Sequence, residues 1–255
     1  MKFDELDEKM RVFETNYDYC VLPKIYIVAR IDGRSFTRLT REIHEFEAPF
    51  DARFRDYMVQ TTSHLMDCGF RTIYGYTESD EISLLFHPGD SLFGRKARKI
   101  ISILAGEASA KFSLLLGDTA CFDARISELP TKDLVVDYFR WRSEDAHRNA
   151  LNSHCYWMLR RKGKTAGEAT DLLSGMSVSD KNELLYQNGI NFNDIPNWQK
   201  RGIGLYWGEY EKASVNPKTQ EHVTAIRRQI VVNYDLPMRE QYDMFIRKAL
   251  EDFSS

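Results

Sequence analysis

Hydrophobic and polar positions follow two different periods along the first half of the chain. In some segments apolar, β-branched and aromatic residues occupy every second position, which is typical of strands. In others they recur every three or four positions, which indicates amphipathic helices. The predicted order is strand 25–31, helix 50–68, strand 71–76, strand 80–86, helix 93–115 and strand 120–126.

This β-α-β-β-α-β order predicts an α+β protein with a ferredoxin-like core, the arrangement of the polymerase palm. In that topology the third strand lies between the first and the second and runs antiparallel to both. Asp32 closes the first strand, and Asp80 opens the third. We therefore expect the two aspartates to meet at one edge of adjacent strands.

The pattern changes after Pro130, and we predict a domain boundary there. Residues 1–130 would form a palm-like catalytic domain, and residues 131–255 a mostly helical extension. The elements predicted in the extension are helices 136–160, 165–187 and 238–253, strands 202–207 and 223–232, and a polar loop at 214–218.

The composition is that of a folded globular protein. Apolar residues make up 43% of the chain and charged residues 29%, and no apolar run approaches the roughly 18 residues of a membrane span. The N-terminus lacks the apolar segment of a secretory signal, so we expect a cytoplasmic protein with no membrane partner. A net charge of −3 gives no general attraction for nucleic acid, so local basic patches at 94–99 and 160–164 would have to hold RNA.

Paired carboxylates are the strongest candidate chemistry. Two-metal phosphoryl transfer uses hard oxygen ligands that hold two Mg²⁺ ions about 3.5–4 Å apart. Asp32 and Asp80 would bridge both ions, and Gly33 has no Cβ to keep its carbonyl away from a metal. Asp-Gly and Ser-Asp are also common turn sequences, so each motif alone has a structural alternative.

The loop that follows Gly33 suits a triphosphate. Residues 34–37 can present successive backbone N–H groups to phosphate oxygens. The alternative is a tight turn that anchors Phe36 in the core, and both can hold at once.

A basic run precedes the second long helix. Asp90 and Ser91 predict its N-cap, which would place Arg95, Lys96, Arg98 and Lys99 in the first turns. Cations there oppose the positive end of the helix dipole, so a bound triphosphate would explain them. A solvated basic face is the alternative.

A third group of polar residues lies in the predicted helix 136–160. His147 and His154 are seven residues apart and share one helical face. Two histidines without a third ligand argue against zinc, and both interhelical polar contacts and RNA phosphate contacts remain open. The basic residues 160–164 would grip RNA phosphates or complement the helix C-terminus.

Together these segments resemble the tRNA-histidine guanylyltransferase family and its bacterial and archaeal relatives, which act as 3′-to-5′ RNA polymerases. The resemblance covers about residues 11–208. The motifs that carry it are Arg30-Ile-Asp32-Gly33-Arg34-x-Phe36, Ser79-Asp80-Glu81-x-Ser83, Arg95-Lys96-x-x-Lys99, Phe122-Asp123-x-Arg125, Trp141-Arg142, Asp180-Lys181-Asn-Glu183 and Gly202 ahead of Leu205-Tyr-Trp207. An ordered set at this spacing is specific, whereas each motif alone is weak.

The resemblance implies a homotetramer in which Asp32, Asp80 and the carbonyl of Gly33 hold two Mg²⁺ ions. It implies tRNA and the nucleoside triphosphates ATP and GTP as substrates, with residues 131–255 serving RNA binding and oligomerisation. The expected nucleotide-binding residues are Gly33, Arg34, Ser35, Phe36, Thr37, Asp51, Ser79, Arg95, Lys96 and Lys99. Those expected at the RNA 5′ end are His147, Asn149 and Lys181, and the candidate tRNA contacts are Arg125, Arg160 and Arg161.

Family members activate a tRNA 5′ phosphate with ATP or use a 5′ triphosphate, which the 3′-hydroxyl of the incoming nucleotide attacks. Here His147-Arg-Asn-Ala-Leu-Asn152 replaces the eukaryotic His-Ile-Asn-Asn-Leu-Tyr-Asn, and Ala48 stands where the family has lysine. These departures favour the branch that repairs 5′-truncated tRNAs against the opposite strand, with guanylate addition to histidine tRNA as the alternative. The rivals from other classes are a nucleotide cyclase and a non-catalytic RNA-binding module.

Overall fold

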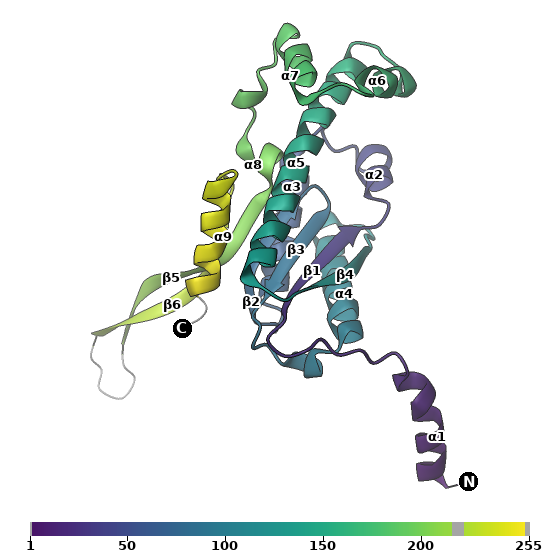
Figure 1. Cartoon of the computed structure of the whole chain (residues 1–255), viewed down its shortest axis with the longest axis vertical. Helices are drawn as coiled ribbons and strands as arrows, with labels where there is room; N and C mark the ends of the chain where they lie inside the picture. The colour runs from purple at the N-terminus through teal and green to yellow at the C-terminus, as the bar shows by residue number, and fades with distance from the viewer. Residues whose placement is uncertain (1, 216–221, 253–255) are drawn as a thin grey trace.

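The chain is built on one antiparallel sheet of six strands, in the order β4-β1-β3-β2-β5-β6 (Figure 1). The computed structural model describes residues 2–215 and 222–252. The strands are β1 Tyr26–Gly33, β2 Thr72–Glu78, β3 Glu81–Phe86, β4 Phe122–Leu129, β5 Ile203–Val215 and β6 His222–Asn233. The predicted strand order is confirmed in the first four, because β3 lies between β1 and β2 and is antiparallel to both.

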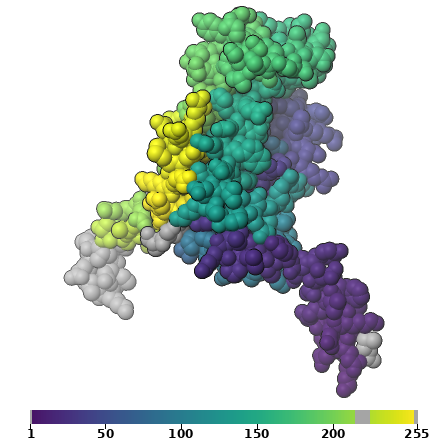
Figure 2. Space-filling model, viewed as in Figure 1, coloured from purple at the N-terminus to yellow at the C-terminus, as the bar shows by residue number. Residues whose placement is uncertain are grey.

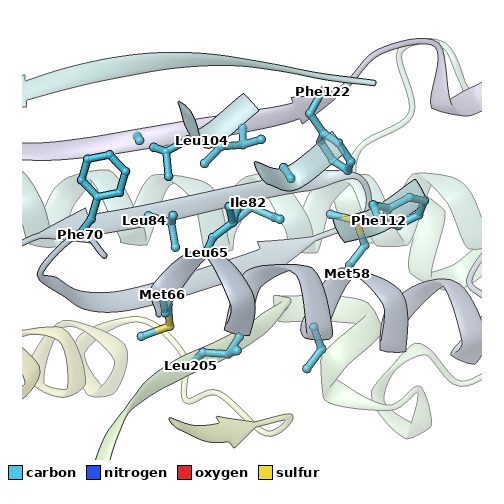
Figure 3. Packing of buried hydrophobic residues seen from close by; sticks show 14 of the residues in the cluster. Met58, Leu65, Met66, Phe70, Ile82, Leu84, Leu104, Phe112, Phe122 and Leu205 are labelled. Atoms are coloured by element: carbon cyan, nitrogen blue, oxygen red, sulfur yellow. The ribbon is translucent and has the colours of Figure 1, made fainter. Parts of the chain in front are cut away.

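Two helices cover one face of this sheet. They are α3, Ala52–Met66, and α4, Ala97–Leu116. Figure 3 shows their apolar side chains meeting those of the strands, with Leu104 of α4 and Leu65 of α3 beside Ile82 and Leu84 of β3. The helical spacing read from the sequence therefore marks the buried side of each helix.

The opposite face is covered by α5, Lys132–Arg161, and α9, Glu240–Asp252, which lie side by side (Figures 1 and 2). Val28 and Leu85 point to this side and join a second core with Phe139 of α5. The layers are thus two helices, the sheet and two helices; α3 and α4 are the two helices of the predicted palm-like core, whereas α5 and α9 come from residues 131–255.

The C-terminal half of α5 continues past the sheet and forms a third core with short helices. Leu151, Cys155 and Leu159 contact Ala169 and Leu185 from the helices that follow. These helices are α6 Ala166–Leu173, α7 Val178–Gln187, η3 Phe192–Asp194 and α8 Asn197–Arg201. These helices lie within residues 131–255, for which the sequence predicts a mostly helical extension.

The sheet itself crosses the predicted domain boundary. β5 pairs with β2 through Ile203 to Tyr206, so the C-terminal half supplies two strands to the palm sheet. Beyond Trp207, β5 and β6 pair only with each other and extend from the body as a two-stranded ribbon (Figure 1). The predicted strand 202–207 was too short for this reason. Of the predicted loop 214–218, Ser214 and Val215 belong to β5, and residues 216–218 lie outside the described residues.

Helix α1, Phe3–Thr15, was not predicted. It stands away from the body of the molecule (Figures 1 and 2), and none of its residues is buried. Its apolar side chains, such as Phe3 and Phe13, are exposed. In residues 2–215 and 222–252, no helix combines the length and apolarity needed to cross a membrane.

The predicted start of the second long helix is wrong. A 3₁₀ turn, η2 Leu92–Arg95, replaces the expected first turn, and α4 begins only at Ala97. Phe93, Gly94 and Arg95 have positive φ values of 54°, 61° and 58°, which an α-helix excludes. Asp90 still caps locally, since its carboxylate accepts the N–H of Leu92 at 2.9 Å.

Candidate active site

Asp32 and Asp80 meet at one rim of the sheet. Asp32 lies opposite Glu81 in the β1–β3 register, and the N–H of Gly33 donates to the carbonyl oxygen of Asp80 at 3.0 Å. Burial raises the pKa of the Asp80 carboxyl, and the charge of Asp32 raises it further. The two carboxylates are therefore close enough to repel each other, and a cation between them would relieve that repulsion.

Gly33 is required where it stands. A Cβ at this position would lie 2.5 Å from Cγ of Phe36, so only glycine lets the Phe36 ring fold back over the end of β1. Phe36, which begins the short helix α2 Phe36–Arg38, is 2% exposed and contacts the rings of Phe54, Phe112 and Phe122. The core-anchoring alternative for Phe36 is thus correct, and Phe36 also lines the cavity described next.

A cavity of about 650 Å³ opens beside Asp80. One wall is the segment from α2 through the π-helix η1, Leu39–Ile43, to the start of α3. The β2–β3 turn forms a second wall, and α5 faces it with Ser153, Tyr156, Trp157 and Arg160. Trp198 and Gln199 of α8 complete the enclosure. The cavity thus joins segments that are more than 100 residues apart in the chain, and its size suits a small ligand such as a nucleotide.

Arg41 fixes the wall opposite α5. Its guanidinium donates to the carbonyl oxygens of Phe46, Glu47 and Pro49 at 3.1, 3.0 and 2.9 Å. It also lies 5.1 Å from the ring centroid of Trp157, within cation–π range. One side chain therefore holds the 41–49 loop and ties it to α5.

Asp51 closes this loop by capping α3. Its carboxylate accepts N–H groups of Arg53 at 2.7 Å, Phe54 at 3.2 Å and Glu47 at 2.8 Å. Asp51 also lines the cavity, as do Phe36, Thr37 and Ser79 from the predicted nucleotide set. Gly33, Arg34 and Ser35 directly precede this wall.

Two further carboxylates lie at the same end of the sheet. Glu81 is buried and receives both arms of the Arg142 guanidinium, at 2.7 and 3.0 Å, with Arg30 at 3.5 Å. Glu78 lines the cavity, and burial together with the neighbouring Glu81 raises its pKa to about 8. Glu81 is therefore bound by two arginines, whereas Arg142 acts on Glu78 only through its charge, without a hydrogen bond.

The residues fit a divalent cation at one position. Asp32 and Asp80 supply carboxylate oxygens. Gly33, which directly follows Asp32, supplies a backbone carbonyl oxygen. Arg125 is 3.7 Å from Asp32, but it is 54% exposed and also pairs with Asp123, so it leaves Asp32 accessible. Among the described residues no group of three or more histidine, cysteine, aspartate or glutamate side chains could hold a metal. The candidate metal ligands are thus two carboxylates and one backbone carbonyl oxygen.

The basic run at 95–99 lies elsewhere, which corrects the argument made for it from sequence. It follows the far end of β3, whose six residues separate it from Asp80 by about 20 Å at about 3.3 Å per residue. Arg95 is buried and donates to the carbonyls of Ile25, Pro88 and Asp90 at 2.6, 3.1 and 2.9 Å. Lys96 pairs with Asp18 at 2.6 Å. Arg95, Lys96 and Lys99 do not line the cavity, because a strand carries the chain away from the rim where it starts.

The residues expected at an RNA 5′ end are spread along α5 and α7. The His147 ring lies 5.4 Å from that of Phe192, and its Nδ1 is buried with no partner in the described part of the chain. Asn149 donates to Asp145, and Lys181 donates to Asn152 at 3.0 Å. None of the three lines the cavity, so their role stays a prediction.

The three arginines predicted to contact tRNA lie at different places in the structure. Arg160 lines the cavity, Arg161 donates to the carbonyl of Ala48, and Arg125 lies at the aspartate rim. The alternative of interhelical polar contacts holds for His154, whose Nε2 is 3.0 Å from Oε1 of Gln199.

Sequence reasoning missed the aromatic side of the site. Trp157 and Trp198 line the cavity from helices far apart in the sequence. Trp198 stands among mostly polar residues and so has a visible signal, whereas Trp157 is flanked by Tyr156 and Met158 and reads like a core position of its helix. Glu78 was missed because a carboxylate ending a strand is ordinary.

A palm sheet with paired aspartates at one rim, beside a cavity lined by arginines and aromatic rings, defines the class of palm nucleotidyltransferases. The family model described as "tRNAHis guanylyltransferase" matches residues 7–130, and the one described as "Thg1 C terminal domain" matches residues 133–244. The chain belongs to the tRNA(His) guanylyltransferase family, a family of nucleotidyltransferase enzymes.

Individual relatives agree with this assignment. A probable tRNA(His) guanylyltransferase of Drosophila melanogaster is 30% identical over 254 residues, which cover 90% of this chain and 88% of the relative. A bacterial tRNA(His) guanylyltransferase (Thg1)-like protein in complex with ATP has a TM-score of 0.74 at 26% identity, over 96% of this chain and 99% of that chain. The corresponding GTP complex has a TM-score of 0.73 with the same identity and coverage.

Proposed function

We propose that this chain adds a guanylate to the 5′ end of histidine tRNA. The observation that carries the proposal is the meeting of Asp32 and Asp80 at one rim, directly beside a cavity of nucleotide size. The names of the matched relatives support this substrate. The sequence departures favour repair of 5′-truncated tRNAs, but the names of the relatives fit guanylate addition to histidine tRNA better.

We propose ATP and GTP as the nucleotides that occupy the cavity. The solved relatives in complex with ATP and with GTP support this choice. Trp157 offers a flat face for a base, and Arg160 lies at the same wall, where it can meet phosphates. Arg41 holds the 41–49 loop against Trp157 of α5 and so shapes the wall that faces the nucleotide.

Asp32, Asp80 and the carbonyl of Gly33 would hold Mg²⁺ in this proposal. When bound, the metal lowers the pKa of a hydroxyl and neutralises charge on phosphate. The two aspartates keep their oxygens at the rim, and Ser79 Oγ donates to Asp80 Oδ1 at 3.2 Å, which orients that carboxylate. The family resemblance further supports a homotetramer, which sedimentation of the purified chain would test.

The test is incorporation of labelled guanylate from GTP into histidine tRNA that carries a 5′ monophosphate, with ATP present. We expect Asp80→Asn to lower the rate by at least about 100-fold, because the variant removes one charged ligand without changing shape. Asp123→Asn is the matched control at the same rim, since its side chain is 61% exposed and should leave the rate within about twofold. An active Asp80→Asn variant would refute the assignment.

The same experiment separates the rivals. A tRNA lacking its first nucleotide, with the opposing base varied, would be extended preferentially by a repair enzyme. A nucleotide cyclase would form cyclic product from ATP without RNA. A non-catalytic module would retain tRNA on a filter but incorporate no label.

A further inference from the structure

A second hollow, of about 610 Å³, lies on the outer side of the wall formed by Arg55 and Trp198. These two residues also line the first cavity, so the hollow and the cavity share them. We call it the outer groove. Its lining is Arg55, Asp56, Val59, Gln60, Trp198 and Tyr234.

The outer groove is built from flat side chains. The Arg55 guanidinium lies 4.7 Å from the ring centroid of Trp198 and 5.4 Å from that of Tyr234. Both distances are within cation–π range, so the guanidinium and the two rings stabilise one another in place. Tyr234 directly follows β6 and is 40% exposed, so part of its ring remains open to a ligand.

The charge of this site excludes a triphosphate as the natural occupant. Arg55 is the only cation among the described residues that line the groove, and its Nη2 is 2.8 Å from Oδ1 of Asp56. The charges of Arg55 and Asp56 cancel locally, so the groove attracts a polyanion such as a triphosphate only weakly. Gln60 is exposed and its side chain makes no hydrogen bond among the described residues, which leaves an amide donor and acceptor free to meet a base edge.

We propose that the outer groove binds the base of an unpaired nucleotide of the RNA substrate, next to the end that reacts in the cavity. Bases of single strands stack on aromatic rings and on guanidinium planes, which is the chemistry that Tyr234, Trp198 and Arg55 present. The shared wall places such a base one side chain away from the cavity. This inference rests on the proposed function, because it takes RNA as the molecule whose 5′ end reacts with the nucleotide bound in the cavity.

The test compares two fluorescein-labelled RNA hairpins with a 5′ monophosphate, one blunt and one with four unpaired nucleotides at its 3′ end. Their dissociation constants are measured by anisotropy with the whole chain. We expect the overhang to tighten binding by about tenfold, as one stacked base would. In Tyr234→Leu that advantage should fall to about twofold, whereas Tyr234→Phe, which keeps the ring, should retain it.

Tyr210→Leu is the matched control, because Tyr210 is 38% exposed and lies on β5 outside the groove. It should keep the tenfold advantage of the overhang. Binding of GTP to Tyr234→Leu should also match the unaltered chain, and melting curves should show that each variant is folded.

Three results would overturn the proposal. The first is an overhang that gives the unaltered chain no advantage. The second is a Tyr234→Leu variant that weakens both hairpins equally. The third is an equal loss of GTP binding in that variant, which would assign the groove to a free nucleotide. Failure of the proposed function is separate, since it would appear as absent guanylate incorporation whatever the hairpins show.

Discussion

Asp51 shows how one side chain sets local structure and faces the cavity at once. It is 9% exposed, and it caps α3 while accepting the N–H of Glu47 from the preceding loop. Burial alone would raise the pKa of its carboxyl, but the backbone N–H donors of Glu47, Phe54 and Arg53 outweigh burial and lower it. The ionised carboxylate is therefore the form that the folded chain stabilises.

We expect Asp51→Ala to lower the free energy of unfolding by about 1–2 kcal/mol at pH 7, because the α3 cap is lost. Asp51→Ser keeps a capping oxygen and should lose less. Since the folded pKa lies below the unfolded one, the contribution of the carboxylate is complete above the ordinary aspartate pKa and is lost as the pH falls through the folded value. Urea unfolding at pH 7 and at about pH 3 measures both effects. A cost of Asp51→Ala that did not shrink in acid would contradict this account.

At the scale of elements, α5 is joined to the sheet by one buried ion pair as well as by apolar contacts. Arg142 is 5% exposed and bonds Glu81 of β3, the residue that directly follows Asp80. Burial raises the pKa of the Glu81 carboxyl, and Arg142 and Arg30 counteract that rise. The pair fixes the start of β3, directly after the turn that contains Asp80.

Arg142→Met should cost about 3–5 kcal/mol in free energy of unfolding, because Glu81 would be left buried without its main partner. Arg140→Met is the matched control on the same helix, since Arg140 pairs with Asp243 at 2.6 Å but is 36% exposed. It should cost about 1 kcal/mol or less, because solvent screens a more exposed pair. Chemical denaturation measures the free energy of unfolding of both variants. Equal decreases would show that the buried Arg142–Glu81 pair stabilises the fold no more than the exposed Arg140–Asp243 pair.

At the scale of the whole molecule, the folded state brings together two like charges that the unfolded chain keeps apart. Asp32 raises the pKa of Asp80, so folding without a cation costs free energy at this rim. Mg²⁺ that binds only the folded chain would offset this cost by about 2.7 kcal/mol at one hundred times its dissociation constant.

We therefore expect saturating Mg²⁺ to raise the melting temperature by about 5 °C and a chelator to reverse the rise. Asp80→Asn should melt at a similar temperature with and without Mg²⁺, because its rim has lost half of the paired charge. Asp123→Asn should respond like the unaltered chain. A melting temperature of the unaltered chain that ignores Mg²⁺ would count against a cation at this rim.

The hydrophobic pattern, through the ferredoxin-like topology that it predicts, determined that β3 lies between β1 and β2 and that Asp32 and Asp80 meet at one rim. Both depend on local periodicity, and the Ser79-Asp80 turn between β2 and β3 leaves those strands only one way to pair. Helix α1 was not predicted, although Phe3, Leu6, Met10 and Phe13 recur every three or four positions, as apolar residues do in the helices that were predicted.

Only the tertiary structure decided which charged and aromatic residues face the cavity. Arg95 reads in the sequence like the other members of a basic run, yet folding buries its guanidinium under backbone carbonyls at the far end of β3. Trp157 and Trp198 line the same cavity as Asp80 because α5 and α8 pack beside the rim. Trp157 and Trp198 are more than 70 positions from Asp80 in the chain, and no local pattern encodes their place at the cavity because it depends on how whole layers pack.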